Sequence, residues 1–252
     1  MRYSMISLGA LMLATTAPAM AQDASETEPA SPITVTSAVT LTSDYRFRGL
    51  SQSNKKVAVQ STVNVNHESG LYVGTWVSTI DDEVSLPGYG DVEVDLYGGY
   101  TKTLGNGVGF DVGALYYYYP DGAKGLKTDF FEPYASVMYT VGPVTAKVGA
   151  NYAWSGQSGL ADNDSLYLRG DLTVAVPNTP VSVIGHIGRT DGQLGVLAVD
   201  SKYTDWSLGA EIAQKFVKLG VQYVDTDITN DSGYADSIGA DPRAVFYMTL
   251  SF

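Results

Sequence analysis

Residues 33–48 read ITVTSAVTLTSDYRFR, and apolar side chains fall mainly at every second position of this stretch. From position 35 to position 47 the odd positions are largely apolar, whereas the even positions carry threonine, alanine, aspartate and arginine. Successive side chains of a strand point to opposite faces, so a period of two indicates a strand with one apolar and one polar face. We therefore expect one strand over residues 34–48, with Asp44, Arg46 and Arg48 on its polar face.

The same period continues to the last residue, and nothing reads as an amphipathic helix of useful length. Clusters of turn residues divide this pattern into about twelve segments, which predicts an all-β fold. The segments lie near residues 34–48, 56–67, 71–80, 91–103, 108–119, 130–141, 144–155, 165–176, 181–190, 203–214, 216–226 and 243–252.

The connections between these segments alternate in length. Three-residue turns such as 68–70 and 105–107 alternate with long loops such as GLSQSNKK (49–56) and DDEVSLPGYG (81–90). This alternation is typical of an up-and-down transmembrane antiparallel β-barrel with short periplasmic turns and long outer loops. A soluble β-sandwich would also hide its apolar faces, but it would not explain the alternation. The prediction is a barrel of about twelve strands, the number of alternating segments.

The two ends of the chain agree with an outer-membrane location. Residues 1–21 have a short basic start, an apolar run and a small-residue cleavage site, as in a secretory signal peptide. Residues 22–32 are polar and contain proline, which predicts a disordered periplasmic leader before a barrel over residues 33–252. The last residues, AVFYMTLSF (244–252), alternate and end on Phe252, the kind of strand that the barrel-assembly machinery reads. A soluble edge strand could end in the same way.

The composition excludes several classes of function. The chain has a net charge of −12, which makes it a poor partner for nucleic acid phosphates. It contains no cysteine, so disulfides, thiolate catalysis and cysteine-bound metals are excluded. The acidic loop 225–241 could attract divalent cations, but it lacks the spacing of a calcium loop and is interpreted as a solvated outer loop. We expect no cofactor and no metal site.

Charged side chains on the inward parity of the strands are the candidates for lining a pore. On a lipid-facing surface each arginine would cost about 2–4 kcal/mol, so the polar face of each strand should point into the lumen. Two interpretations remain open: a salt-bridge network that plugs a narrow barrel, or a charged constriction that selects solutes. The candidates are Asp44, Arg46, Arg48, Glu93, Asp95, Glu132, Lys147, Arg169 and Asp171.

Three segments resemble a known family. SDYRFRGLSQS (43–53), VAVQSTVNVNHESGLYVGTWVS (57–78) and DVEVDLYGGY (91–100) are similar to the start of the proteobacterial TorF-type porin family, with its SDYRFRG-type motif. The resemblance implies an outer-membrane barrel with a channel, in contact with lipid and lipopolysaccharide. It implies no substrate and no catalytic residue.

We therefore expect a porin-like channel for passive diffusion of small hydrophilic solutes. The alternatives are a non-conducting structural or adhesion barrel whose loops bind a partner and, least favoured, a membrane hydrolase. Of the two histidines, His67 has the lipid-facing parity at a strand end, and His186 has the inward parity without an evident catalytic partner. The tyrosines 116–119 are expected to form part of an aromatic girdle at the membrane interface.

Overall fold

The computed structural model describes residues 31–160, 163–195 and 197–252. The predicted signal peptide and most of the predicted leader lie outside these residues, so both stay predictions. None of the helices in the described part of the chain is long and apolar enough to cross a membrane.

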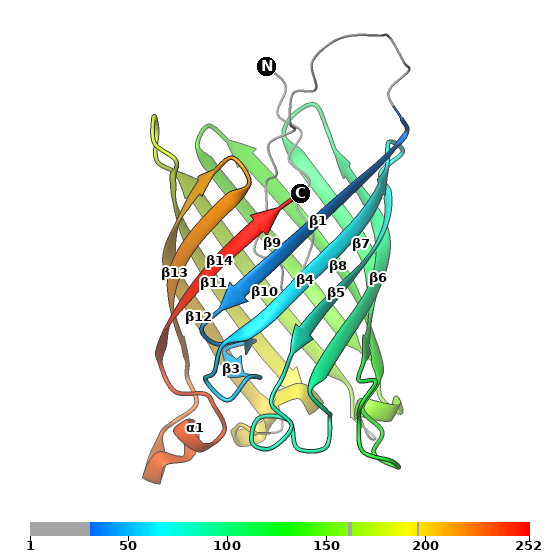
Figure 1. The fold of residues 1–252 in the computed structure, drawn as a ribbon, viewed down its shortest axis with the longest axis vertical. Coiled ribbons are helices and arrows are strands. Elements are labelled where there is room, and N and C mark those ends of the chain that lie inside the picture. The colour runs from blue at the N-terminus through cyan, green and yellow to red at the C-terminus, as the bar shows by residue number, and fades with distance from the viewer. Residues whose placement is uncertain (1–30, 161–162, 196) are drawn as a thin grey trace.

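Twelve antiparallel strands close into a barrel (Figure 1). Each strand pairs with its neighbours along the chain, and β1 pairs with both β4 and β14, which closes the sheet. The predicted all-β barrel is therefore confirmed. The strands are β1 (Ile33–Thr42), β4 (Ala58–His67), β5 (Leu71–Thr79), β6 (Val92–Thr103), β7 (Val108–Tyr118), β8 (Phe130–Val141), β9 (Val144–Ala153), β10 (Ser165–Ala175), β11 (Val181–Gly192), β12 (Lys202–Gln214), β13 (Val217–Thr226) and β14 (Arg243–Ser251).

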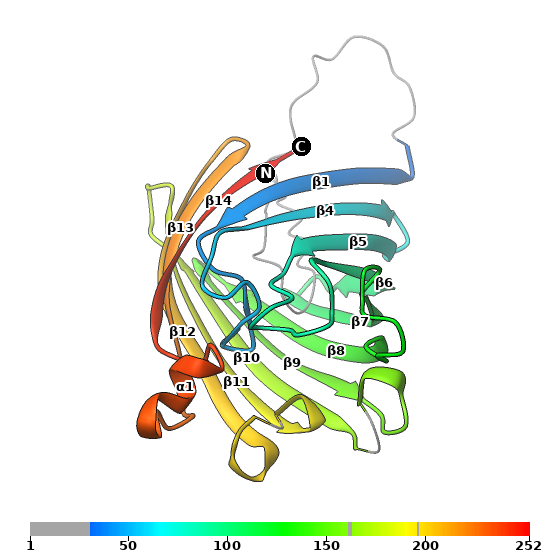
Figure 2. The same ribbon diagram turned by 60° about the horizontal axis from the view of Figure 1, so that its bottom comes forward.

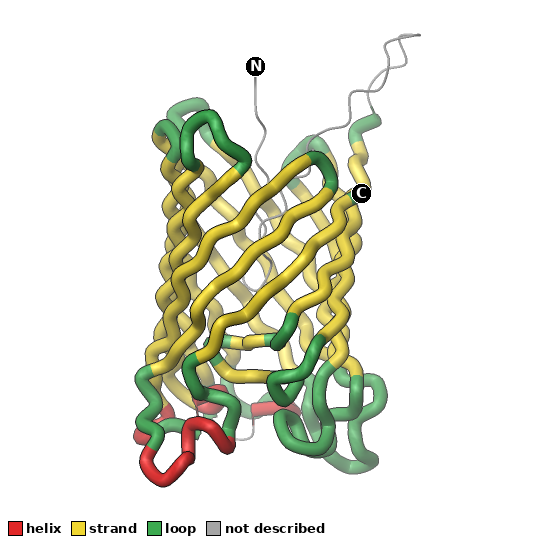
Figure 3. The backbone as a smooth tube through the Cα atoms, turned by 60° about the vertical axis from the view of Figure 1, so that its left-hand side comes forward, coloured by secondary structure: helices red, strands yellow, loops and turns green. Residues whose placement is uncertain are grey.

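The short turns gather at one end of the barrel and the long loops at the other (Figure 3). We call these the short-turn end and the long-loop end. The chain ends at the short-turn end, where β1 also begins (Figure 1). The long-loop end carries the short helix α1 (Tyr234–Ser237) and the 3-10 turns Ser158–Leu160, Gln193–Gly195, Val199–Ser201 and Asp231–Gly233.

The first strand is shorter than predicted. It ends at Thr42, and residues 43–56 turn into the lumen, where β2 (Arg46–Phe47) and β3 (Leu50–Ser51) form a small hairpin (Figure 2). The hydroxyl of Thr42 donates to the carbonyl of Asp44 at 2.8 Å, at the point where the chain leaves the wall. The prediction of one strand over 34–48 is therefore wrong, and we call residues 43–56 the inner hairpin.

The outer surface of the barrel is apolar and has an aromatic band near each end. Exposed aromatic side chains near the long-loop end include Tyr118, Phe131, Trp154, Trp206 and Tyr223. The corresponding residues at the short-turn end are Tyr100, Phe110, Tyr139, Phe216 and Phe252. Such bands are typical of barrels in a membrane, where amphipathic rings sit at both interfaces.

The tyrosine run 116–119 supplies only half of its rings to the outer band. Tyr116 and Tyr118 stack on the outer face with ring centroids 6.4 Å apart. Tyr117 is buried inside the barrel and stacks on Phe130 at 4.3 Å. Tyr119 packs edge-on against the Tyr89 ring. The prediction that all four lie in the girdle is wrong, because successive side chains of a strand point to opposite faces.

Inward-facing tyrosines lie flat across glycines of the neighbouring strand. A β-carbon added to Gly220 would lie 2.1 Å from Cζ of Tyr247, the residue directly opposite in register. The same close approach joins Gly74 to Tyr97 and Gly113 to Tyr134. A glycine leaves room for the ring to cover the backbone, so these tyrosines follow the wall instead of crossing the lumen.

Gly220→Val should therefore destabilise the barrel. The new side chain would push the Tyr247 ring off the wall and break its hydrogen bond to Oε2 of Glu211, which is 3.2 Å long. Overpacking of this kind costs about 1–3 kcal/mol. The matched control is Gly185→Val, since the nearest atom to a β-carbon there is 3.9 Å away. Urea unfolding in lipid vesicles measures both variants, and an equal loss of stability in the two would contradict the role of the ring.

Candidate functional site

The lumen holds the candidate site, and the inner hairpin is its central element. Phe47 pairs with Leu50, so Arg48 and Gly49 are the two central residues of the turn. Their φ angles are 49° and 83°. Two positive φ values define the type I′ turn that matches the twist of a two-residue hairpin. For Arg48 this backbone conformation costs about 1–3 kcal/mol, a strain that is found mostly at functional sites.

The tip of the inner hairpin packs against the wall at β12 and β13. A β-carbon on Gly49 would lie 2.5 Å from Cγ2 of Thr226 on β13 and 2.9 Å from Cβ of Asp205 on β12. Glycine is therefore required here both for its positive φ and for its lack of a side chain. The hairpin starts between β1 and β4, and β13 and β12 are the second and third strands from β1 on the β14 side, so Gly49 packs against a near part of the wall while the hairpin lies inside the barrel (Figure 2).

Arg48 binds the far wall through a buried ion pair. Its Nη2 donates to Oε1 of Glu132 on β8 at 2.5 Å, and its Cζ lies 4.3 Å from the centre of the Tyr167 ring. Glu132 also accepts hydrogen bonds from the hydroxyl of Tyr117 and the side-chain amide of Asn151. Among the described residues, Nε and Nη1 of Arg48 have no hydrogen-bond partner. The guanidinium is thus held by one carboxylate and by aromatic rings, with part of its donor capacity unused.

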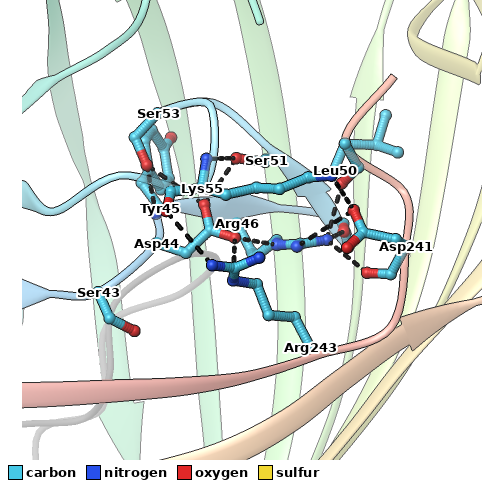
Figure 4. A network of polar contacts seen from close by, with 12 residues as sticks. Ser43, Asp44, Tyr45, Arg46, Leu50, Ser51, Ser53, Lys55, Asp241 and Arg243 are labelled. Carbon is cyan, nitrogen blue, oxygen red and sulfur yellow. Dashed lines mark hydrogen bonds and ion pairs between the residues drawn. The ribbon is translucent and has the colours of Figure 1, made fainter. Parts of the chain in front are cut away.

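The base of the inner hairpin is organised by Asp44 (Figure 4). Its carboxylate accepts hydrogen bonds from Nε of Arg46 at 2.6 Å, from Oγ of Ser51 at 2.6 Å and from Oγ of Ser53 at 3.2 Å. Arg46 Nη1 donates in turn to the backbone carbonyls of Gly49, Gly239 and Asp241. Asp44 and Arg46 therefore fix the shape of the hairpin rather than line a strand.

A second polar cluster lies on β10, β11 and β12. Arg169 Nη1 donates to Oδ2 of Asp171 at 2.6 Å, and Nδ1 of His186 lies 2.6 Å from Oδ1 of the same carboxylate. Nε2 of His186 lies 2.8 Å from the hydroxyl of Tyr167 and 3.1 Å from Oδ1 of Asp205. Tyr167 and Asp205 also touch the hairpin tip. The cluster therefore connects the hairpin to the wall beneath it.

The inner wall differs between two sets of strands. On β5 to β8 an apolar cluster joins Tyr45 of the hairpin to Trp76, Tyr117 and Phe130 of the wall. On β10 and β11 the wall is polar and partly exposed, with 34% of the Asp171 side chain and 25% of the His186 side chain accessible. Solvent thus reaches inward-facing groups of β10 and β11, whereas the cluster on β5 to β8 is packed.

The nine predicted site residues all lie inside the barrel, but they do not form one ring. Asp44, Arg46 and Arg48 belong to the inner hairpin, and the other six belong to strands of the wall. The ion pairs among the nine are Asp44–Arg46, Arg48–Glu132 and Arg169–Asp171. No ion pair in the described part of the chain involves Glu93, Asp95 or Lys147, which are nevertheless buried.

Some contacts of the site were not predicted. Asp205 and Tyr167 have the inward parity of their strands, so the alternation alone could have identified them. Asp241 lies in the loop that was interpreted as solvated, yet only 18% of its side chain is exposed and it lies 2.8 Å from Nζ of Lys55. No period in the sequence points to that contact. No group of three or more His, Asp or Glu residues within the described ranges is placed to hold a metal ion.

With this geometry in place, comparisons with known proteins can be interpreted. Residues 26–252 match the model of a family described as "Bacterial protein of unknown function (Gcw_chp)". The chain belongs to this family. That description contains neither a function nor the TorF-type name. No curated protein matches the sequence.

Two of the solved structures with a similar fold are porins. The NanC porin is 11% identical with a TM-score of 0.57, and the match covers 87% of this chain and 99% of that chain. The KdgM porin, solved in complex with disordered oligogalacturonate, is 8% identical with a TM-score of 0.56, over 86% of this chain and 98% of that chain. At such low identity the likeness shows a common barrel fold.

Glu132→Gln should destabilise the protein strongly, because it leaves the Arg48 guanidinium buried without a counter-charge. Removing one partner of a buried ion pair costs about 3–5 kcal/mol. Replacing both partners, as Arg48→Gln with Glu132→Gln, should recover much of this loss. The control is Asp227→Asn, which removes an exposed ion pair with Arg189 and should cost at most about 1 kcal/mol. If Glu132→Gln unfolds in urea at the same midpoint as this control, the pair does not hold the hairpin.

Proposed function

We propose that the protein is an outer-membrane, porin-like channel for the passive diffusion of small hydrophilic solutes. The observation that carries the proposal is a closed barrel with an apolar outer face and a charged interior. Such a sheet satisfies its backbone groups in hydrocarbon and encloses a charged interior that is separated from lipid. The common fold with solved porins and the resemblance of residues 43–53 to TorF-type porins support the same function.

The partners of the channel follow from this location. The outward apolar side chains would contact outer-membrane lipid and lipopolysaccharide. Strand β14 is followed by Phe252, whose side chain is exposed. This last segment is the part of the chain that the barrel-assembly machinery would recognise. These partners rest on the chemistry of the surface and on the proposed location.

A non-conducting structural or adhesion barrel is the second candidate, and one observation favours it. At the level of the inner hairpin the side chains of Asp44, Tyr45 and Arg48 are almost fully buried. A hairpin that never moved would leave the barrel closed, and its outer loops would then be the functional surface.

The positions of the two histidines support a hydrolase less well than a channel or a closed barrel. Nδ1 of His67 lies 2.8 Å from the hydroxyl of Ser69, but it also accepts the backbone N–H of Ser69, so this contact belongs to an exposed turn. His186 lies between two carboxylates and a tyrosine hydroxyl. Neither arrangement prepares a serine for attack on a carbonyl group.

We expect the channel to prefer cations weakly at low salt. The outer loops carry exposed acidic side chains, including Glu83, Asp121 and Asp231, whose field concentrates cations at the mouth. The wall is more balanced, since Arg48, Lys147 and Arg169 lie among carboxylates. Planar-bilayer recording of folded, heat-modifiable protein should show discrete conductance, and reversal potentials under a salt gradient should give the ion preference.

The preference should fade between 0.01 M and 1 M salt, as the screening length falls from about 30 Å to about 3 Å. Replacing Glu83, Asp121 and Asp231 with their amides should weaken it, whereas Asp164→Asn, a single change, should have a smaller effect. Anion preference in the native protein at low salt would show that the arginines control the constriction. Complete absence of conductance would favour the closed barrel instead.

A further inference from the structure

Among the described residues, the backbone of the inner hairpin is joined to strands of the barrel only at its two ends, and its other contacts with the wall are made by side chains. The β1–β4 ladder stops at the pair Thr42–Ala58, and Ser43 donates its backbone N–H to the carbonyl of Phe246 on β14. Between these anchors, the backbone hydrogen bonds of the hairpin within the described residues run inside it or to loops, as from the N–H of Ser51 to the carbonyl of Gly239. The hairpin could therefore leave the lumen without breaking any pair of barrel strands.

The docked position also contains unfavourable features. Arg48 has a positive φ, and its buried guanidinium leaves two nitrogen atoms without a hydrogen-bond partner among the described residues. The attraction between Arg48 and Glu132 is offset by the free energy needed to remove both charges from water. Strain and unsatisfied donors at the tip of a loop indicate an element with a second accessible position.

One long loop holds the inner hairpin from outside. Residues 227–242, between β13 and β14, place Asp236 and Asp241 against the ammonium group of Lys55. The carbonyl of Gly239 in this loop accepts a hydrogen bond from Nη1 of Arg46 at 2.7 Å. We call these contacts the latch. The latch is mainly ionic and lies at the long-loop end.

An apolar contact accompanies the latch. Leu50, at the far side of the hairpin turn, packs with Tyr203 of β12 and with Ala235 and Ala240 of the same loop. The loop thus covers the side of the hairpin that faces away from the short-turn end. The hairpin can move towards the long-loop end only after its contacts with loop 227–242 break.

We propose that the inner hairpin is a gate, which loop 227–242 latches in the lumen and which must leave its docked position before solutes can pass. The inference rests on the proposed channel and adds its regulation. With the hairpin docked, the apolar cluster around Tyr45 and the buried Arg48–Glu132 pair fill the lumen. Release of the latch lets the strained turn and the unsatisfied guanidinium reach water.

Salt, rather than pH near neutrality, should control the latch. The hydrogen bond from Lys55 lowers the pKa of Asp236, so this charge is lost only in acid below the usual carboxylate range. Burial opposes the charge on Lys55, but hydrogen bonds to Asp236 and Asp241 raise its pKa, so its charge is lost only at strongly alkaline pH. Both charges persist between these limits, whereas salt screens them.

Cross-linking the latch provides the test, and the chain has no native cysteine to interfere. Lys55→Cys with Asp236→Cys joins hairpin to loop through a short thiol-reactive cross-linker that a reducing agent removes. The open probability in planar bilayers should fall to near zero after cross-linking and return on reduction. The matched control is Asp191→Cys with Lys202→Cys, an exposed pair opposite in register on β11 and β12, whose cross-link leaves both the hairpin and loop 227–242 untouched. Its conductance should not change.

The outcomes separate the gate from the channel. If the cross-linked latch variant conducts as well as its reduced form, the hairpin does not move and the gate is overturned, while the channel stands. If neither the native protein nor the reduced variant conducts although both are heat-modifiable, the proposed channel is overturned and the gate with it.

A second pair of variants tests the ionic character of the latch without cysteines. Asp236→Asn with Asp241→Asn should raise the open probability at low salt to the value that the native protein shows at high salt. Lys202→Gln, which removes an exposed ion pair with Asp191, should leave it unchanged. An open probability of the amide variant equal to that of the native protein at every salt concentration would overturn the latch.

Discussion

The pairing of β1 with β14 closes the sheet, and the rest of the molecule depends on this closure. In hydrocarbon an unpaired strand edge would cost several kcal/mol for each exposed backbone group, so an open sheet could not cross a membrane. Once the edges meet, every strand has a lipid face and a lumen face, and charges can be placed on the second without contact with lipid. The ion pairs around Arg48, Arg169 and Lys55 all lie within or above this enclosed space.

The barrel itself could be predicted from the sequence because its signal is local. Alternation in segments such as 91–103 and 130–141 reports which side chains share a face, and the alternating connection lengths report the topology. The same signal failed at residues 43–48, where Asp44, Arg46 and Arg48 continue the alternation after the strand has left the wall. The inner hairpin also consists of short strands, so its side chains alternate as those of a wall strand do. The alternation therefore cannot distinguish a strand in the wall from a hairpin inside the lumen.

The candidate site could be predicted only in part. Inward parity correctly placed Glu132, Lys147 and Arg169 inside the barrel, although whether they line an open pore stays a prediction. The partners of the hairpin depend on contacts between distant parts of the chain, such as Arg48 with Glu132 and Lys55 with Asp236. A single sequence contains no local pattern for such contacts. The one available signal was Arg48–Gly49, since a glycine after a polar residue between two short apolar stretches is typical of a tight hairpin turn.

The tyrosine–glycine pairs have a consequence for the bore of the barrel. A ring that lies on a glycine occupies the lumen by its thickness and not by its length, so a wall rich in tyrosine remains thin. The inner width of the barrel and its stability are therefore coupled. Replacing Tyr247 with a smaller residue would uncover the backbone at Gly220. Adding a side chain at Gly220 would rotate the Tyr247 ring into the lumen. The two positions can change together, but neither can change alone without altering how wide the barrel is inside.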